Sequence, residues 1–427
     1  MKSQIRKSLF VVSATFMLVF ALTDGWMIGA PAAAALVIQG DPKCEEKFPN
    51  AESPDPRATV VMCGLDNPRG LAFSQFALYV AEAGRGGLGL STTDCFTGQA
   101  GGFRCYGPSG AISRLFNGVQ ERIATGFPSH ASVGGFSAIG PNDIGVVPET
   151  AATIGLELPA FSSECAPGCA FVTIGLQQPP RFRETFPFLR DFAKLVRIAA
   201  TGDWSYVADL GAYEARVDPD HDFYNPDKLD TNPYGLSAEP SGRGVVLTDA
   251  GGNSILRVAT GGKVSGSIST VAALPPHPDD AVPTSVTVGP DGAYYVGELS
   301  GFPPVAGAAN IIRIGHPSDA PTVCLSGFTL IIDIAFDKLG NLYVLQYSGS
   351  LIHIAPDRSA MPAVPADNVL CARYAAGDRT TVITGLTNPT SVEVGSDGAI
   401  YISNRGTAPA RVVGGQVIGG QVIRFEL

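Results

Sequence analysis

One phrase occurs twice in the chain, and this repeat constrains the fold more than any other feature of the sequence. Residues 388–406 read NPTSVEVGSDGAIYISNRG, and residues 282–301 read VPTSVTVGPDGAYYVGELSG. In the first copy, Val392 and Val394 alternate with polar residues before an Asp-Gly pair, and Ile400 resumes the alternation after it. A period of two is typical of strands, and Asp-Gly favours a two-residue hairpin turn. The phrase predicts two strands joined by such a turn.

Further copies of the phrase occur along the chain. A second pair of strand patterns follows most of them, as in GAISRLFNGVQERIATGF from residue 110. Four strands per unit of about 40–50 residues is the period of a β-propeller blade. Tryptophan occurs only at positions 26 and 204, which excludes WD-type repeats. Aligned on the first apolar residue of the first strand, the copies number six: Leu71, Ile144, Leu236, Val286, Ile334 and Val392.

The two ends of the repeat region predict how the ring closes. The chain ends in GGQVIRFEL, which has the pattern of a third strand with no fourth strand after it. Residues 58–65, ATVVMCGL, resemble the fourth strands of other copies. Pairing these two segments would remove an open sheet edge. We therefore expect an all-β fold, a six-bladed β-propeller over residues 57–427 with the N-terminal strand closing the last blade and long insertions in blades 1 and 2.

The first 35 residues have the pattern of a signal peptide. Lys2, Arg6 and Lys7 precede an apolar stretch over residues 8–22, and small residues follow from Gly29. The apolar stretch is shorter than the ~20 residues that a spanning helix needs. We expect residues 36–56 to form an N-terminal arm of a secreted, extracellular or periplasmic protein, with no stable membrane span after cleavage. An uncleaved anchor is the alternative.

Composition narrows the class of partner. Charged residues make up 16% of the chain and the net charge is −10. Nucleic-acid binding needs a basic face, so this balance argues against it. We expect a small molecule, a glycan or a protein to bind on the face of the ring that carries the long loops, since function concentrates on loops held by a rigid scaffold.

The cysteines predict disulfides. An even number of cysteines in an exported chain favours disulfide bonds over catalytic thiols, and no paired CxxC motifs suggest zinc. Proximity and blade order suggest Cys95–Cys105, Cys165–Cys169, Cys324–Cys371 and Cys44–Cys63, which is one pairing among 105 possibilities. All eight cysteines follow the expected leader: Cys44, Cys63, Cys95, Cys105, Cys165, Cys169, Cys324 and Cys371.

Polar residues recur where the second strand of a copy ends. Repeat symmetry would place them around one mouth of the central channel, where they could contact a ligand. Their carboxylates would focus negative potential there and attract a cation, Ca²⁺ rather than Zn²⁺ because the ligands are hard oxygens. The alternative is that they cap strand ends. The candidates are Glu82, Asp249, Glu298, Gln346 and Asn404, with Asn253 beside them.

An acidic loop, ARVDPDHDFYNPDKLDTNP, is a second candidate metal site. Asp218, Asp220 and Asp222 alternate in it, an oxygen-rich spacing that suits Ca²⁺. The EF-hand pattern fails, because Phe223 stands where Gly is needed and Leu229 where Glu is needed. A solvated acidic loop is the alternative.

Several strings resemble the ScyD/ScyE family, among them TDAGGN from residue 248 and VGELSGFP from residue 296. The resemblance covers nearly the whole chain after the leader and implies an exported NHL-like propeller. The family offers no established activity or catalytic residue to carry over. The chain departs from it at DPDHDFYNPDKLD, where relatives tend to be richer in glycine.

Two function classes therefore remain open. The first is a binding or scaffold module that holds a ligand or partner at the channel mouth. The second is a hydrolase or lyase resembling six-bladed lactonases, with a channel metal held by Glu82, Asp249, Glu298 and Asn404. The chain has no HExxH, GxSxG or Walker motif. The sequence alone does not decide between an enzyme and a binding protein.

We predict that export removes the leader by cleavage between Ala30 and Leu36, where small residues follow the apolar stretch. The intact mass of the protein recovered outside the cytoplasm tests this expectation. A mass that retains residues 1–30 would replace secretion with an anchored form.

Overall fold

The computed structural model describes most of the chain after the leader. The described residues are 39–47, 57–74, 77–87, 94–99, 101–147, 169–199, 201–221, 229–239, 242–275, 280–301, 303–315, 319–359, 369–413 and 416–427. Within these ranges, no helix is both long enough and apolar enough to cross a membrane.

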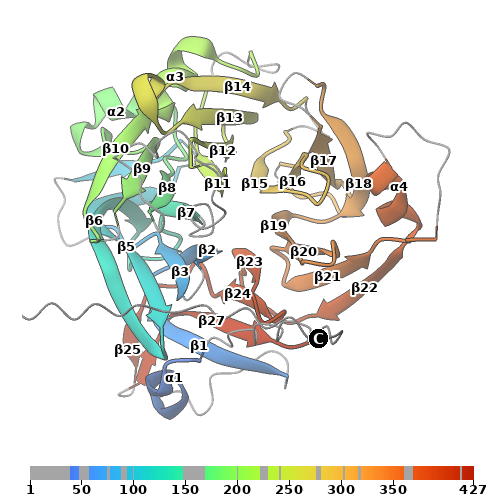
Figure 1. Ribbon diagram of the computed structural model, residues 1–427. Helices are drawn as coiled ribbons and strands as arrows, with labels where there is room; N and C mark the ends of the chain where they lie inside the picture. The colour runs from blue at the N-terminus through green and yellow to red at the C-terminus, as the bar shows by residue number, and fades with distance from the viewer. Residues whose placement is uncertain are drawn as a thin grey trace, which may run out of the picture. The chain divides into compact units, whose positions relative to one another are not determined.

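Six antiparallel sheets are arranged in a ring (Figure 1), which confirms the six-bladed β-propeller. Blade 1 contains β2 (Pro68–Phe73), β3 (Ala77–Glu82), β5 (Phe103–Phe116) and β6 (Val119–Ser132), with β4 (Cys95–Thr97) paired to β5. Blade 2 contains β7 (Pro141–Val146), β8 (Ala170–Ile174), β9 (Lys194–Ile198) and β10 (Trp204–Asp209). Blade 3 contains β11 (Pro233–Ala238), β12 (Gly244–Asp249), β13 (Ser254–Ala259) and β14 (Ile268–Ala273).

Blades 4, 5 and 6 form the second half of the ring, with four strands each. Blade 4 contains β15 (Pro283–Val288), β16 (Tyr294–Glu298), β17 (Ala309–Ile314) and β18 (Thr322–Phe328). Blade 5 contains β19 (Ile331–Phe336), β20 (Leu342–Gln346), β21 (Ser350–Ala355) and β22 (Asp378–Ile383). Blade 6 contains β23 (Ser391–Val394), β24 (Ile400–Asn404), β27 (Gly420–Phe425) and β1 (Ala58–Leu65).

The other described elements are a small hairpin, short helices and 3-10 turns. A small hairpin, β25 (Arg411–Val413) and β26 (Gln416–Ile418), lies between β24 and β27 in sequence. The helices are α1 (Pro42–Lys47), α2 (Phe182–Thr185), α3 (Leu210–Val217) and α4 (Val369–Ala376), with 3-10 turns at Pro187–Leu189 and Gly262–Val264.

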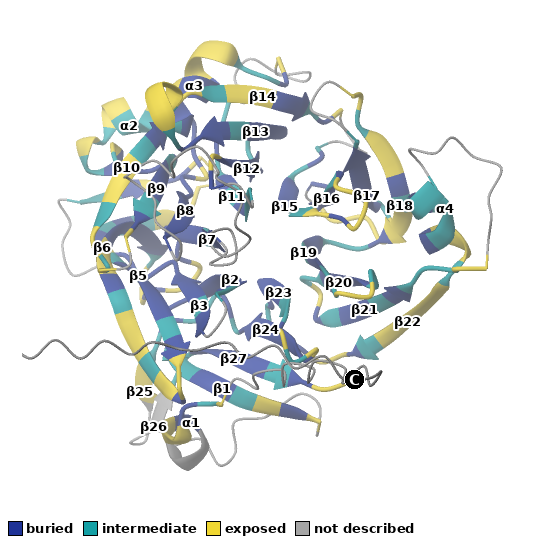
Figure 2. Cartoon of the chain, in the orientation of Figure 1, coloured by how far each residue is buried: buried dark blue, intermediate teal, exposed yellow. Residues whose placement is uncertain are grey.

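The first strand of each blade lies innermost, around the centre of the ring (Figure 1). All six apolar residues aligned from the sequence lie on these strands and are buried. Buried residues dominate the inner strands, whereas exposed residues concentrate on outer strands such as β14, β18 and β22 (Figure 2). The repeated phrase therefore builds the inner half of each blade.

The N-terminal strand closes the ring as expected. β1 pairs antiparallel with β27, from Ala58 opposite Phe425 to Leu65 opposite Gly420. β27 in turn pairs with β24, so β1 is the fourth and outermost strand of blade 6. This pairing covers the backbone edge that β27 would otherwise expose.

The hairpin turn of the repeated phrase differs from the prediction of two residues. The Gly395 amide donates to the Ala399 carbonyl over 2.9 Å, which leaves a three-residue loop between them. Gly398 occupies it with φ of 80°, a backbone conformation in which glycine avoids the steric penalty of a side chain. The counterpart is the same, with Gly289 donating to Ala293 over 2.9 Å. The two-residue prediction was wrong because glycine here closes a loop that is one residue longer.

The aspartate of this turn has a structural role. Asp397 accepts the Ala399 amide over 3.1 Å and the Tyr401 hydroxyl over 3.0 Å, and it forms a salt bridge to Arg424 over 2.9 Å. Arg424 lies on β27, so the contact joins the first hairpin to the third strand. In blade 4 Asp291 forms the corresponding salt bridge to an arginine of the third strand.

Three of the four expected disulfides are present. Cys44–Cys63 joins the N-terminal arm to β1, Cys95–Cys105 joins β4 to β5, and Cys324–Cys371 joins β18 of blade 4 to α4 of blade 5. The fourth expected pair, Cys165–Cys169, includes Cys165, which lies outside the described residues.

We predict that replacing Cys324 and Cys371 together by alanine lowers the free energy of unfolding by about 2–4 kcal/mol, because the bond closes a long loop in the unfolded chain. Chemical denaturation of the oxidised protein measures the change. A double variant as stable as the parent would contradict a stabilising role. Reduction of the unmodified protein should lower stability in the same direction.

Candidate functional site at the channel mouth

The polar residues at the second-strand ends bind the backbone of their own blades. The Asp66 amide donates to Glu82 over 2.6 Å, the Thr329 amide to Gln346 over 2.6 Å, and the Thr387 amide to Asn404 over 2.8 Å. In each case the donor lies just ahead of the inner strand. These side chains therefore fix the chain where it enters the blade.

Each of the carboxylates among them has a partner inside the protein. Glu82 forms a salt bridge to Arg122 over 2.6 Å, and Asp249 accepts the Asn232 amide over 2.6 Å. Glu298 accepts from the Asn310 amide group over 2.9 Å, and burial raises the pKa of Glu298 to about 7. The three carboxylates lie in three different blades, each with its own internal partners.

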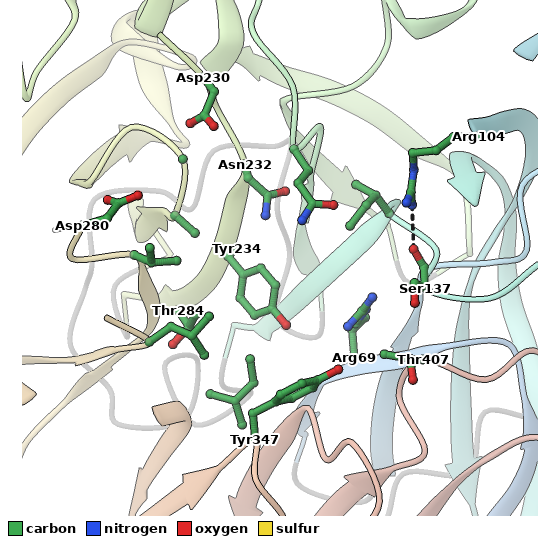
Figure 3. Close-up of a pocket in the computed structure, with 17 residues that line it drawn as sticks. Arg69, Arg104, Ser137, Asp230, Asn232, Tyr234, Asp280, Thr284, Tyr347 and Thr407 are labelled. Atoms are coloured by element: carbon green, nitrogen blue, oxygen red, sulfur yellow. Dashed lines mark hydrogen bonds between the residues drawn. The ribbon is translucent and has the colours of Figure 1, made fainter. Parts of the chain in front are cut away.

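A cavity of about 480 Å³ opens at the channel mouth. Residues other than the six channel-mouth candidates form its wall, although Ala250 and Gly251 follow Asp249 directly. Arg69 and Arg104 lie on one side, Asp230 and Asp280 on the other, and Tyr234 projects between them (Figure 3). The remaining lining residues are Ser137, Ile139, Gln177, Asn232, Ala250, Gly251, Val282, Thr284, Leu299, Ile332, Tyr347 and Thr407.

Arg69 is the more deeply placed of the two arginines. It lies on inner strand β2 with 6% of its surface exposed, and its Nη2 donates to the Ala138 carbonyl over 2.7 Å. Its Nε is buried and has no hydrogen-bond partner among the described residues. A buried charged donor with an unused N–H is costly unless something else satisfies it.

Arg104 is held by a neutral histidine. Its Nε donates to His130 Nδ1 over 2.7 Å and its Nη2 donates to the Ser137 carbonyl over 2.6 Å. His130 is fully buried, and burial, followed by the charge of Arg104, lowers the pKa of His130 well below its ordinary value. With Nδ1 accepting, the ring proton lies on Nε2, 3.0 Å from the Leu176 carbonyl. The histidine therefore positions Arg104 without adding charge.

The two guanidinium groups have no anionic partner among the described residues. Within the described part of the chain, neither Arg69 nor Arg104 forms an ion pair; both contact neutral groups. Burial, and then the charge of Arg69, lowers the pKa of Arg104 to about 10, so the two charges act on each other. One side of the cavity thus carries positive charge and the opposite side carries Asp230 and Asp280, where the sequence had suggested only negative charge.

Three further acids lie on inner strands and were not singled out from the sequence. Asp143, Asp333 and Glu393 belong to blades 2, 5 and 6. Burial, and then the charges of Asp333 and Glu393, raises the pKa of Asp143 well above its ordinary value, so the three act on one another across the ring. Each is adjacent in sequence to an aligned apolar residue, and that position was the available signal.

The acidic loop brings together a different trio from the one expected. Carboxylate oxygens of Glu214, Asp218 and Asp220 lie within 4.8 Å of one another. Glu214 belongs to α3 and was missed because it precedes the alternating aspartates. Asp222 lies outside the described residues. Asn253 joins this cluster to blade 4, because it donates to Asp220 over 3.1 Å and accepts the Val282 amide over 3.0 Å.

No family model matches the chain, and no curated protein matches its sequence. Among solved structures it is similar to virginiamycin B lyase from Staphylococcus aureus with quinupristin, at 14% identity over 86% of this chain and 88% of that one, with a TM-score of 0.41. A putative oxidoreductase (glucose dehydrogenase) from Thermus thermophilus matches at 15% identity, 87% and 99% coverage and a TM-score of 0.47. The calcium-binding protein regucalcin from Agrobacterium tumefaciens matches at 15% identity, 59% and 69% coverage and a TM-score of 0.37. Similarity at these levels carries no argument about activity.

We predict a pH-dependent stability from Glu393, whose pKa is raised to about 8 by burial and the charge of Asp333. Because this folded-state pKa exceeds the unfolded value of about 4.3, the stabilisation is fully present below the unfolded value and is lost as the pH rises through the folded one. Glu393→Gln should therefore gain stability relative to the parent as the pH rises from 5, and be clearly more stable at pH 9.

Melting curves between pH 5 and pH 9 measure this difference, with Glu121→Gln as an exposed control. The expected gain of Glu393→Gln at high pH is at least ~1 kcal/mol, equivalent to about one pKa unit. Parallel pH profiles for Glu393→Gln and the parent would show that Glu393 does not titrate differently in the folded state.

Proposed function

We propose that the protein is an exported binding module whose channel-mouth cavity holds a small organic anion. The observation that carries this proposal is the pair of arginines, Arg69 and Arg104, which share one cavity wall without a carboxylate partner in the described chain. Arginine offers a planar fork of donors that matches a carboxylate or phosphate. A bound anion would reduce the repulsion between the two charges.

The rest of the cavity indicates the body of the ligand. A volume of about 480 Å³ suits a molecule of drug-like size. Ile139, Leu299 and Ile332 supply apolar surface, and Tyr234 and Tyr347 supply aromatic faces. Asp230 and Asp280 on the opposite side would repel a second anionic group. The favoured ligand class is therefore a monocarboxylate with an aromatic or apolar body.

Export and family membership belong to the same proposal. Three disulfides support a location outside the reducing cytoplasm. The strings that resemble the ScyD/ScyE family contribute to the cavity wall, TDAGGN through Ala250 and Gly251 and VGELSGFP through Leu299. If the chain belongs to that family, this wall is the part that members would share.

A lactonase-like enzyme is the second candidate, and the three acids on inner strands favour it. Asp143, Asp333 and Glu393 could contribute ligands to a divalent cation in the channel, where the ion would polarise a substrate carbonyl, although their carboxylate oxygens do not all lie within 4.8 Å of one another. Asp143 and Asp333 already accept amide hydrogens from neighbouring inner strands, at Leu236 over 2.6 Å and Val392 over 2.9 Å. These bonds occupy oxygens that a metal would need, so we rank binding first.

The experiment compares benzoate, as an aromatic monocarboxylate, with neutral benzamide by isothermal titration calorimetry. We expect benzoate to bind and benzamide to bind at least ~10-fold more weakly, which corresponds to about 1.4 kcal/mol. Arg69→Gln should lose the preference for benzoate. Arg114→Gln is the matched control, because Arg114 lies on the same strand as Arg104 and pairs with Glu121 away from the cavity.

Equal binding of the two compounds, or benzoate binding that survives in Arg69→Gln, would contradict the anion site. Melting temperatures of both variants show whether they remain folded. Hydrolysis of a lactone by the parent that depends on Glu393 would favour the enzyme instead.

A further inference from the structure

Glu214 is a buried acid that the channel mouth does not use. It lies on α3, between blades 2 and 3 in sequence, and none of its surface is exposed. Neither carboxylate oxygen has a hydrogen-bond partner among the described residues. Burying an unsatisfied carboxylate costs several kcal/mol, so this side chain needs a partner that the described residues do not provide.

The surroundings of Glu214 add negative charge. Asp218 and Asp220 place carboxylate oxygens within 4.8 Å of it, and a buried oxygen of Asp218 also has no hydrogen-bond partner among the described residues. Burial, followed by the charges of neighbouring aspartates, raises the pKa of Glu214 to about 10. No salt bridge from lysine or arginine reaches Glu214 or Asp218 within the described chain.

The local backbone holds the three acids in place. Asp218 ends α3 in the left-handed conformation, and its amide bonds back to the Glu214 carbonyl over 2.9 Å. Asp220 is buried and accepts a hydrogen bond from the side-chain amide of Asn253. The Glu214 carboxylate packs against Gly252, where an added Cβ would lie 2.6 Å from Oε2. The geometry is therefore fixed by both α3 and the turn after β12.

We infer that Glu214, Asp218 and Asp220 form a Ca²⁺ site. Hard carboxylate oxygens suit Ca²⁺, which takes six to eight oxygen ligands in flexible geometry, and backbone carbonyls and water can complete such a shell. The cluster contains no histidine or cysteine, which argues against zinc. The ion would link α3 to the turn after β12. Asn253, which contacts both Asp220 and Val282, would connect the site to the cavity wall. This inference does not depend on the proposed anion site.

The test measures Ca²⁺ binding and melting temperature on the full mature chain after treatment with chelator. We expect CaCl2 to raise the melting temperature of the parent, because an ion that binds only the folded state stabilises it by mass action. Mg²⁺ should give a smaller shift, since it demands tight octahedral geometry. Equilibrium dialysis counts the bound ions directly.

Glu214→Gln should lose the Ca²⁺-dependent shift and one bound ion. In chelator it should melt at or above the parent, since Gln is close to Glu in size and cannot ionise beside Asp218 and Asp220, and this result also shows that the variant is folded. Glu184→Gln is the matched control, because it removes an exposed carboxylate from α2, which shares a surface groove with α3. It should keep both the shift and the ion.

Three outcomes would overturn the site. They are a parent melting temperature that is the same in CaCl2 and chelator, an equal shift with Mg²⁺, and an unchanged ion count in Glu214→Gln. The last would place the ion elsewhere in the ring. Asp218→Asn provides a second variant, for which we expect the same loss of the Ca²⁺-dependent shift.

Discussion

The pairing of β1 with β27 is the contact on which the rest of the molecule depends. Without it blade 6 would have three strands and an uncovered edge. Closure also sets β23 beside β2, where Ser391 accepts the Leu71 amide over 3.1 Å. That contact fixes the strand carrying Arg69. Segments from the two ends of the chain thus determine the geometry of the cavity together.

The polar residues that recur in the repeat accept hydrogen bonds from the backbone. Glu82, Gln346 and Asn404 occupy one position of the repeat, and each accepts an amide hydrogen just ahead of an inner strand. The chemistry that could serve a ligand appears where the repeat is broken. Arg104 comes from the long β5 of blade 1, and Glu214 from the helix inserted after blade 2.

The sequence predicted the architecture because each blade is built from local patterns. The six aligned apolar residues, the closing strand and three disulfides follow from alternation, spacing and proximity. The hairpin loop was predicted one residue too short, since Asp-Gly is compatible with either length. The cavity could not be predicted in this way. Arg69 and Arg104 are 35 positions apart, and only the packing of strands shows that they share a wall without carboxylate partners in the described chain.

The cavity wall is built from several blades, and this composition links ligand binding to the stability of the ring. Its residues come from blade 1 at Arg69, blade 3 at Tyr234, blade 4 at Thr284, blade 5 at Tyr347 and the loop after β24 of blade 6 at Thr407. No single blade, and no pair of neighbours, contains enough of the wall to make the same contacts. Binding of a ligand that touches all of them would stabilise the whole ring against cooperative unfolding. Occupancy would then protect amide hydrogens from exchange in blades far apart in sequence, and not in one local segment.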